Sequence, residues 1–326
     1  MNEIREISNL FKEFKKLHIL VIGDLILDKY IWGEVSRISP EAPVPVIRVK
    51  NKENRLGGAS NVAANLISLG AETTLAGIVG NDQDGNIFSE LLDEKGIHQI
   101  IVRTAERNTI VKSRVLAQNQ QLMRIDEEET GQIDRDTQED IVNRIEKNIT
   151  KFDGIIISDY MKGLLDREII QKVLTLAGDR KIVIDPKGHD YKKYRGATAI
   201  KPNFKEFRFA LHQPDLQKDD IPEFALEMVD DLDLDGIVIT MGEDGAFVLD
   251  DKKRDYRIST KVKEVYDVSG AGDTFIAAFT AGLVLTDDWH KAARAGNVAS
   301  GIAVGKVGTA AVTLDEVLNN KNLKIS

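Results

Sequence analysis

Short runs of apolar residues recur along the chain and alternate with stretches in which apolar residues return every three or four positions. The apolar runs predict strands at 18–23, 73–80, 154–159, 181–185, 198–201, 236–240 and 245–250. Several of these runs are apolar throughout, which is typical of strands covered on both faces. The pattern between them predicts helices at 60–69, 84–95, 136–150, 166–178, 204–211 and 221–231. This alternation favours an α/β fold with a doubly wound, mostly parallel sheet and helices on both of its faces.

Two segments interrupt the alternation. Residues 29–56 and 98–125 are strand-like and contain no long helical pattern, so we expect a small sheet beside the main one, within a single domain spanning 1–326. In TIVKSRVLA, Lys112 and Arg114 stand two residues apart and share one strand face at a separation of roughly 7 Å. The pair is either an exposed basic edge that discourages edge pairing or a site for an anion of phosphate size.

Composition removes several classes of function. The 326 residues carry a formal net charge of −9 with no strongly basic stretch, which argues against nucleic-acid binding. The chain has no cysteine, which excludes disulfides, thiolate nucleophiles and cysteine-ligated metals. The N-terminal segment lacks the apolar core of a signal peptide, and no apolar run is long enough to span a bilayer. We therefore expect a cytoplasmic protein that does not bind membranes.

The first predicted strand ends in GDLILD, which places Asp24 at the carboxyl edge of the sheet, with Asp28 following. Ligands of open α/β sheets bind at that edge. Asp24 is therefore either an ordinary turn or cap residue or a carboxylate that accepts hydrogen bonds from sugar hydroxyls. Gly57 and Gly58 precede a predicted helix that has Asn61 near its start, where a polar ligand could approach the backbone. Dinucleotide binding fits poorly, because no G-x-G-x-x-G turn follows the first strand.

The stretch YDVSGAGDTF places Gly270, Ala271 and Gly272 directly before Asp273 and an apolar helix. The first N–H groups of a helix lack internal partners, and glycine lets a ligand approach them closely. The helix dipole also favours negative charge at this end. The stretch is therefore either a glycine turn with an aspartate cap or an anion-binding helix start.

Two later strands also end in polar residues. Asp185 and Lys187 follow KIVID, and TAIKPNFKEF places Asn203 and Glu206 three residues apart at a helix start. This spacing directs both side chains toward the same end of the helix. A magnesium nucleotide suits the pattern, because Mg²⁺ keeps several waters that a carboxylate can hold. TMGEDGAFV, which follows, is by itself a simple hairpin.

Together these motifs resemble the ribokinase-type (PfkB) carbohydrate kinases. GGASNVAANLISLGAETTLAGIVG, from Gly57 to Gly80, matches the N-terminal signature of that family, and DVSGAGDTFIAAFT, from Asp267 to Thr280, matches its C-terminal signature. KPNFKE and TMGEDG also fit, so the resemblance covers nearly the whole chain in the expected order. It implies a ribokinase-like fold and transfer of a phosphoryl group from ATP to a sugar, with Mg²⁺ as cofactor.

The resemblance also implies roles for particular residues. Asp273 corresponds to the general base, and the amides of Gly270 to Gly272 correspond to an anion hole for the transferred phosphoryl group. On the nucleotide side the corresponding residues are Asn203, Glu206, Thr240, Gly242 and Asn297, with Glu206 holding Mg²⁺ through water. On the sugar side they are Asp24, Gly57, Gly58 and Asn61, with Asp185. Asp267 and Ser269, with loop carbonyls near Gly308, correspond to a site for a monovalent cation such as K⁺.

Within the family, GDLILDKYIWGEVSRISPEAPVPVI, NQQLMRID, SDYMKG and VGKVGTAAVT resemble the heptose 7-phosphate kinases of lipopolysaccharide precursor synthesis. The implied reaction converts D-glycero-D-manno-heptose 7-phosphate and ATP into the 1,7-bisphosphate. Many bacteria fuse this kinase to a nucleotidyltransferase with an H-x-G-H motif. None of the five histidines has that spacing, so we expect a stand-alone kinase. The two strand-like segments correspond to a lid that closes over the sugar and pairs two subunits, which implies a homodimer.

A sugar phosphate needs cations, and the candidates are Lys112, Arg114 and Lys187, with Arg37 as an outside one. Two alternatives stay open. The first is a kinase of the same family for another sugar or phosphosugar, because the fold does not determine the acceptor. The second is a sugar-binding regulator without catalysis, which the presence of Asp273 and of both nucleotide-side residues of KPNFKE disfavours.

Overall fold

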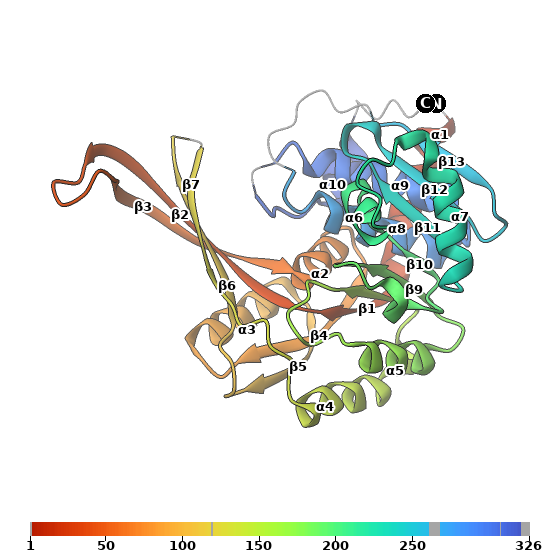
Figure 1. Ribbon diagram of the computed structural model, residues 1–326, viewed down its shortest axis with the longest axis horizontal. Helices are drawn as coiled ribbons and strands as arrows, with labels where there is room; N and C mark the ends of the chain where they lie inside the picture. Colours follow the sequence, from red (N-terminus) through yellow and green to blue (C-terminus); the bar gives the residue numbers. More distant parts are fainter. Residues whose placement is uncertain (1, 119, 261–267, 307, 321–326) are drawn as a thin grey trace.

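The computed structural model describes residues 2–118, 120–260, 268–306 and 308–320. Its largest sheet has nine strands in the order β13-β12-β11-β10-β9-β8-β1-β4-β5 (Figure 1). These strands are β1 (His18–Gly23), β4 (Glu72–Gly80), β5 (His98–Thr104), β8 (Gly154–Ser158), β9 (Lys181–Asp185), β10 (Ala199–Ile200), β11 (Gly236–Thr240), β12 (Ala246–Leu249) and β13 (Asp255–Ile258). Neighbours from β11 to β5 pair in parallel, and β12 and β13 extend one edge as antiparallel strands.

Strand β1 lies between β4 on one side and β8 on the other. The chain therefore winds outward in two directions from the middle of the sheet. Such a reversal opens a crevice at the carboxyl ends of the strands, where α/β proteins bind ligands. Asp24 directly follows β1 and Asp159 directly follows β8, so both lie at this crevice.

Helices cover both faces of the sheet, because successive side chains of a strand point to opposite faces. Ile19 and Val21 of β1 belong to one apolar core, and Leu20 and Ile22 belong to the other. The first core packs against α1 (Asn2–Glu13), α2 (Ala59–Ser68), α3 (Gln83–Lys95), α8 (Ala271–Thr286), α9 (Trp289–Ala303) and α10 (Leu314–Asn319). The second packs against α4 (Arg135–Glu146), α5 (Arg167–Ala177), α6 (Phe204–Ala210) and α7 (Ile221–Asp231). Within the described ranges, no helix combines the length and apolar composition that a bilayer-spanning helix needs.

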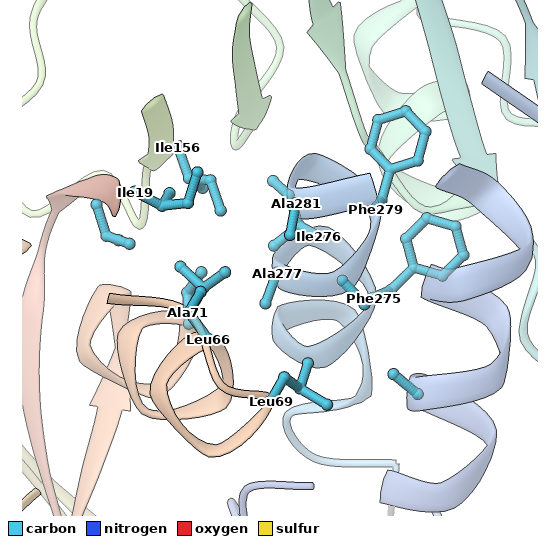
Figure 2. Packing of buried hydrophobic residues seen from close by; sticks show 14 of the residues in the cluster. Ile19, Leu66, Leu69, Ala71, Ile156, Phe275, Ile276, Ala277, Phe279 and Ala281 are labelled. Carbon is cyan, nitrogen blue, oxygen red and sulfur yellow. The ribbon is translucent and has the colours of Figure 1, made fainter. Parts of the chain in front are cut away.

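Helix α8 is packed on two sides. Figure 2 shows Ile276 pointing toward α2 and β1, whereas Phe275 and Phe279 point away from them. Phe279 contacts Trp289 at the start of α9, with ring centroids 5.9 Å apart. Because neighbours hold α8 from both sides, its first turn, which carries Asp273, has a fixed position relative to β1.

A second sheet has four strands in the order β3-β2-β6-β7. They are β2 (Leu25–Ile38), β3 (Pro45–Gly58), β6 (Ile110–Ala117) and β7 (Gln120–Glu127). β2 begins directly after Asp24, and β3 runs directly into α2, so the β2–β3 hairpin is rooted at the crevice. Its far end projects away from the body of the molecule (Figure 1). We call this four-stranded sheet the small sheet.

The strands and helices predicted for the main sheet are confirmed, with shifted ends. One prediction is wrong: residues 98–104 form β5, which pairs with β4 in the main sheet and does not join the small sheet. β5 buries Ile100 and Val102 on one face, and its other face is more exposed. An edge strand of either sheet would show this alternation, so the pattern alone does not indicate which sheet the strand joins. Strand β13 was not predicted. The small sheet contains most of residues 29–56 and most of the part of 98–125 that follows β5, as predicted.

Candidate active site

A cleft of about 470 Å³ lies between the start of α8 and the loops that follow β9, β10 and β11. Its lining includes Asp185, Lys187, Lys201, Asn203, Glu206, Thr240, Gly242, Gly270, Ala271, Gly272, Asp273 and Asn297. All of these except Lys201 are site residues predicted from the sequence. Residues that are far apart in the chain thus meet at the carboxyl edge of the sheet.

The start of α8 is built around glycine. Gly270, the N-cap, has a φ of +78° and so adopts the left-handed conformation that glycine tolerates best. A Cβ atom at this position would lie only 2.9 Å from Nδ2 of Asn61, so glycine also allows α2 to approach. A Cβ atom at Gly272 would lie 3.5 Å from Nζ of Lys201. The positive end of the helix dipole and an ammonium group therefore lie together, an arrangement that attracts anions.

One amide of this helix start already has a partner. The N–H of Ala271 donates to the carbonyl of Val268 over 3.3 Å, which is a long hydrogen bond. An incoming anion can compete with a bond of this length more easily than with one near 2.9 Å. The anion hole implied for Gly270 to Gly272 remains a prediction.

Asp273 is buried in the first turn of α8, and two neutral donors hold its carboxylate. Nδ2 of Asn61 donates to Oδ2 over 2.7 Å, and the hydroxyl of Tyr160 donates to Oδ1 over 3.1 Å. Burial, together with the nearby carboxylate of Asp185, raises the pKa of Asp273 to about 6, against the lowering effect of these hydrogen bonds and of Lys201. A carboxylate with this pKa is mostly ionised at neutral pH and can accept a proton readily.

Asp24 is the second buried carboxylate of the site. Its Oδ2 atom accepts hydrogen bonds from the backbone N–H groups of Tyr160 (2.8 Å) and Lys162 (3.1 Å). Burial and the neighbouring Asp159 raise the pKa of Asp24 to about 6. Asp24 lies at the junction of β1 and the small sheet and is not among the residues that line the cleft, so its sugar-binding role stays a prediction.

The two glycines at the end of β3 leave no room for a side chain. Gly58 has a φ of +56°, and a Cβ atom there would lie 2.6 Å from the carbonyl oxygen of Asp24. A Cβ atom at Gly57 would lie 2.7 Å from Oδ2 of Asp28. Both glycines therefore let β3 pass directly against the acidic end of β1 and β2.

A helix cap organises the end of the cleft at α6. The side chain of Asn203 accepts from the backbone N–H of Glu206, and Glu206 accepts in return from the N–H of Asn203, which makes a capping box at the start of α6. Glu206 also pairs with Nζ of Lys187. Burial lowers the pKa of Lys187. The attraction of the Asp185 and Glu206 carboxylates outweighs this effect, so the pKa of Lys187 lies above its ordinary value.

Three more predicted nucleotide-side residues line the same end. Thr240 forms a parallel β-bridge with Asn203, which joins β11 to the start of α6. Gly242 has a φ of +63° in the turn that follows. Nδ2 of Asn297 donates to the carbonyl of Ser259 over 3.1 Å, which holds α9 against the loop after β13.

Comparison with known proteins agrees with this geometry. Residues 16–316 match the model of the pfkB family carbohydrate kinases. The chain is 40% identical over 320 residues to the bifunctional protein HldE of Geotalea uraniireducens, and the match covers 97% of this chain and 65% of that protein. It is 44% identical over 310 residues to the bifunctional protein HldE of Helicobacter hepaticus, and that match covers 94% of this chain and 64% of the relative. The chain thus spans slightly less than two thirds of the length of these relatives.

The chain belongs to the PfkB family of carbohydrate kinases. Its fold agrees with this assignment: phosphofructokinase-2 from Escherichia coli superimposes with a TM-score of 0.76 at 20% identity, covering 92% of this chain and 96% of that one. Kinases of this family transfer a phosphoryl group from ATP to a sugar and use a divalent metal.

The acidic side chains of the cleft fit that metal. Asp185 and Glu206 both line it, and Oδ1 of Asp185 is a buried acceptor with no hydrogen-bond partner, although Nζ of Lys201 lies 3.2 Å away. Among the residues that the structure describes, no cluster of three or more His, Asp or Glu side chains could enclose a metal ion. Mg²⁺ bound to a nucleotide needs only one or two carboxylates, because phosphates and water supply its other ligands. Glu206 would hold those waters, and Asp185, which the family resemblance assigned to the sugar side, lines the same cleft and could hold them as well.

The predicted phosphate-binding cations lie in different surroundings. Lys112 and Arg114 lie on one face of β6, as the strand spacing predicted. Nη1 of Arg114 donates to Asp28 over 2.6 Å, at the base of the small sheet. Lys187 lies at the nucleotide end of the cleft instead, next to Glu206.

Lys112 belongs to a separate ion-pair group that reaches Asp24 through Lys162. Its Nζ atom donates to Glu128 over 2.8 Å and to Asp126 over 2.9 Å. Nζ of Lys162 donates to the other oxygen of Glu128 over 2.7 Å. Because the backbone N–H of Lys162 binds Asp24, this group connects the small sheet with the sugar-side carboxylate.

Three predicted residues remain. Arg37 pairs with Val46 near the tip of the β2–β3 hairpin, roughly 30 Å along the strand from Asp28 at 3.3 Å per residue. Asp267 lies outside the described residues. Ser269 is half-buried directly before Gly270, so the monovalent-cation site stays a prediction.

Sequence reasoning missed Tyr160, Lys162 and Lys201. Tyr160 and Lys162 lie in SDYMKG, directly after β8 and thus at the same sheet edge as Asp24. That position was a usable signal, because β8 neighbours β1. Lys201 is a buried lysine that directly follows β10, and its pairing with Asp185 became visible only in three dimensions.

Proposed function

We propose that this PfkB kinase transfers the γ-phosphoryl group of ATP to the C1 hydroxyl of D-glycero-D-manno-heptose 7-phosphate. The product is the 1,7-bisphosphate, a precursor of ADP-heptose and of the lipopolysaccharide core. The observation that carries the proposal is the buried Asp273 carboxylate at the start of α8, which faces the cleft beside the sugar-side residue Asn61. The identity of about 40% with proteins named HldE supports the choice of a heptose.

In the proposed mechanism, Asp273 accepts the proton of the C1 hydroxyl as its oxygen attacks the γ-phosphorus. The bond between that phosphorus and the bridging oxygen breaks, and ADP leaves. Such transfers depend on positioning and charge stabilisation more than on covalent help from the protein. The amides from Gly270 to Gly272 and the ammonium group of Lys201, which line the cleft together, would stabilise the charge of the transferred group. Mg²⁺, when bound, neutralises charge on the phosphates.

The acceptor sugar is proposed to lie between Asp24 and Asp273. Asp24 would accept hydrogen bonds from sugar hydroxyls, and Asn61 would hold both the base and the sugar. Oδ2 of Asp24 already accepts two backbone N–H groups, which leaves its other oxygen for the ligand. Gly57 and Gly58 keep this wall of the site free of side chains.

The group formed by Lys112, Lys162 and Glu128 is the best candidate for the sugar phosphate. Two lysines from different parts of the fold meet at one carboxylate, within 2.8 Å, and all three side chains are largely shielded from water. A phosphate monoester carries up to two negative charges, so it can displace the single charge of Glu128. Arg114 offers a third cation two residues beyond Lys112 in β6, where it now binds Asp28.

An ADP-release assay with a panel of phosphosugars tests the proposal. The panel contains D-glycero-D-manno-heptose 7-phosphate, sedoheptulose 7-phosphate and fructose 6-phosphate, with phosphorus NMR of each product. Selective turnover of the manno-heptose, with a new anomeric phosphate resonance, is the expected result. Turnover of another sugar would keep the mechanism and reject the substrate. The absence of turnover in a protein that binds ATP would reject catalysis on all three acceptors.

Three finer features belong to the same proposal. We expect K⁺ to stimulate the enzyme through Asp267 and Ser269, and a cytoplasmic location, where ATP is available. We also expect a homodimer formed through the small sheet, because Met123 and Ile125 of β7 are exposed apolar side chains on one face of that sheet. Sedimentation at several protein concentrations, with Met123→Lys as the disruptive variant, tests the dimer.

A further inference from the structure

Tyr160 contacts both carboxylates of the proposed acceptor site. Its backbone N–H donates to Oδ2 of Asp24 over 2.8 Å, and its hydroxyl donates to Oδ1 of Asp273 over 3.1 Å. Asp24 follows β1 and Asp273 lies in α8, so a single residue joins two elements that are far apart in the chain. We propose that Tyr160 is a positioning residue that orients the base Asp273 and fixes its distance from the sugar-binding Asp24.

The hydrogen bonds of Asp273 define its orientation. Asn61 donates to Oδ2 and Tyr160 donates to Oδ1, so each oxygen has one fixed donor. Donors on both oxygens, from α2 and from the loop after β8, fix the plane of the carboxylate. Each carboxylate oxygen can accept more than one hydrogen bond, so the acceptor hydroxyl still finds a free lone pair.

The tyrosine itself is held firmly. The next residue, Met161, has a φ of +58°, and its N–H donates to Oδ1 of Asp159 over 2.8 Å. Asp159 is buried and accepts a further hydrogen bond from the hydroxyl of Tyr194 over 2.7 Å. Lys187 lies over the ring of Tyr160, with Nζ 5.7 Å from its centroid. The loop after β8 therefore does not have to rearrange for Tyr160 to reach Asp273.

The hydroxyl of Tyr160 remains a donor at every working pH. Burial and the carboxylates of Asp273 and Asp185 raise the pKa of Tyr160 well above its ordinary value. A donor that does not ionise favours the charged form of Asp273. The charged groups that also face Asp273 are Asp185 from β9, Lys187 from the loop after β9 and Lys201 from the end of β10, and none of them changes when the hydroxyl is removed.

Tyr160→Phe removes the hydroxyl and keeps the ring and the N–H bond to Asp24. Hydrogen bonds to charged groups have strengths that correspond to about one to two pKa units, and the 3.1 Å length of this one favours the lower figure. The acidic limb of kcat/KM should therefore move about one unit toward higher pH, and kcat should fall roughly tenfold. The KM values for ATP and for the sugar should change by less than about twofold, because both binding ends remain.

The decisive measurement needs no substrate, although the inference rests on the proposed role of Asp273 as base. Carbon NMR of the full chain, labelled at aspartate carboxyl groups, follows the titration of Asp273 in the wild type and in Tyr160→Phe, with assignment by Asp273→Asn. A midpoint raised by about one unit in Tyr160→Phe supports the inference even if every phosphosugar fails as substrate. An unchanged midpoint overturns it even if the heptose is turned over.

One control and one alternative variant complete the test. Tyr256→Phe removes a hydroxyl from Asp250, outside the cleft, and should leave the titration of Asp273 and the pH profile unchanged. If Tyr160→Phe does not fold, 3-fluorotyrosine at position 160 replaces it. Its hydroxyl is a stronger donor, so the midpoint of Asp273 should move to lower pH, and a midpoint that stays or rises overturns the inference.

Discussion

At the proposed nucleotide end of the cleft, polar side chains are held mostly by residues close to them in sequence. Asn203 and Glu206 cap the same helix three residues apart, and Asp185 pairs with Lys201 sixteen residues away. At the sugar end, Asn61 reaches Asp273 over 212 positions, and Arg114 reaches Asp28 over 86.

This difference separates two tasks of the kinase. The phosphoryl donor is common to many enzymes of this architecture, and short local motifs on the main sheet can hold it. The acceptor end depends on how the small sheet meets the body, so it can change without disturbing the donor end. The cations of the proposed acceptor end are paired with carboxylates, and in the proposed function the sugar phosphate would replace those partners.

The largest effect is expected where the two ends meet. Asp273→Asn should lower kcat at least about a hundredfold and leave ATP affinity unchanged, because it removes the base but spares the nucleotide end. Steady-state kinetics and ATP titration calorimetry measure the two quantities. Near-normal turnover would remove Asp273 from the mechanism.

A smaller effect, confined to the sugar end, is expected for Lys162→Met. The KM for heptose 7-phosphate should rise by about ten- to a hundredfold, since hydrogen bonds to charged groups are worth about 1.5–3 kcal/mol. The KM for the unphosphorylated heptose and for ATP should stay the same, because the backbone bond to Asp24 remains. Lys172→Met is the matched control, since Lys172 forms its ion pairs on the surface of α5. Equal weakening of both sugars would mean that Lys162 does not bind the phosphate.

Glu206→Gln tests the nucleotide end alone. Residues that hold a metal through its waters typically contribute about ten- to a hundredfold in metal affinity, and we expect the lower figure here because the capping box can survive as an amide. The concentration of Mg²⁺ that gives half-maximal rate should rise about tenfold, with the KM for the sugar unchanged. A change in the sugar KM of the same size would contradict the separation of the two ends.

The smallest effect concerns pH. A base must be ionised, and the pKa of Asp273 is raised to about 6, so kcat/KM should rise with pH and level off above neutrality. At pH 6 it should be about half of its value at pH 8. The pKa of Asp24 is also raised to about 6, so Asp24 can contribute to the same acidic limb of the pH profile. In Asp24→Asn, the part of the limb that disappears is the contribution of Asp24. A flat profile down to pH 5 would show that neither carboxylate must ionise.

Much of the molecule could be predicted from the sequence by itself. Apolar runs and helical periodicity placed the strands and helices of the main sheet, because these signals come from burial of side chains on each element. The glycines before Asp273 and the three-residue spacing of Asn203 and Glu206 indicated two helix starts, since capping and left-handed turns depend on neighbouring residues.

The tertiary structure decided the rest. An alternating strand such as residues 98–104 can join either sheet, and only its packing beside β4 assigns it to the main one. The hydroxyl of Tyr160 reaches Asp273, and Lys162 meets Lys112 at Glu128, because β8 and the small sheet lie beside the start of α8 and β1. Such partners depend on which elements pack together over long sequence distances, and neither hydrophobic periodicity nor local spacing contains that information.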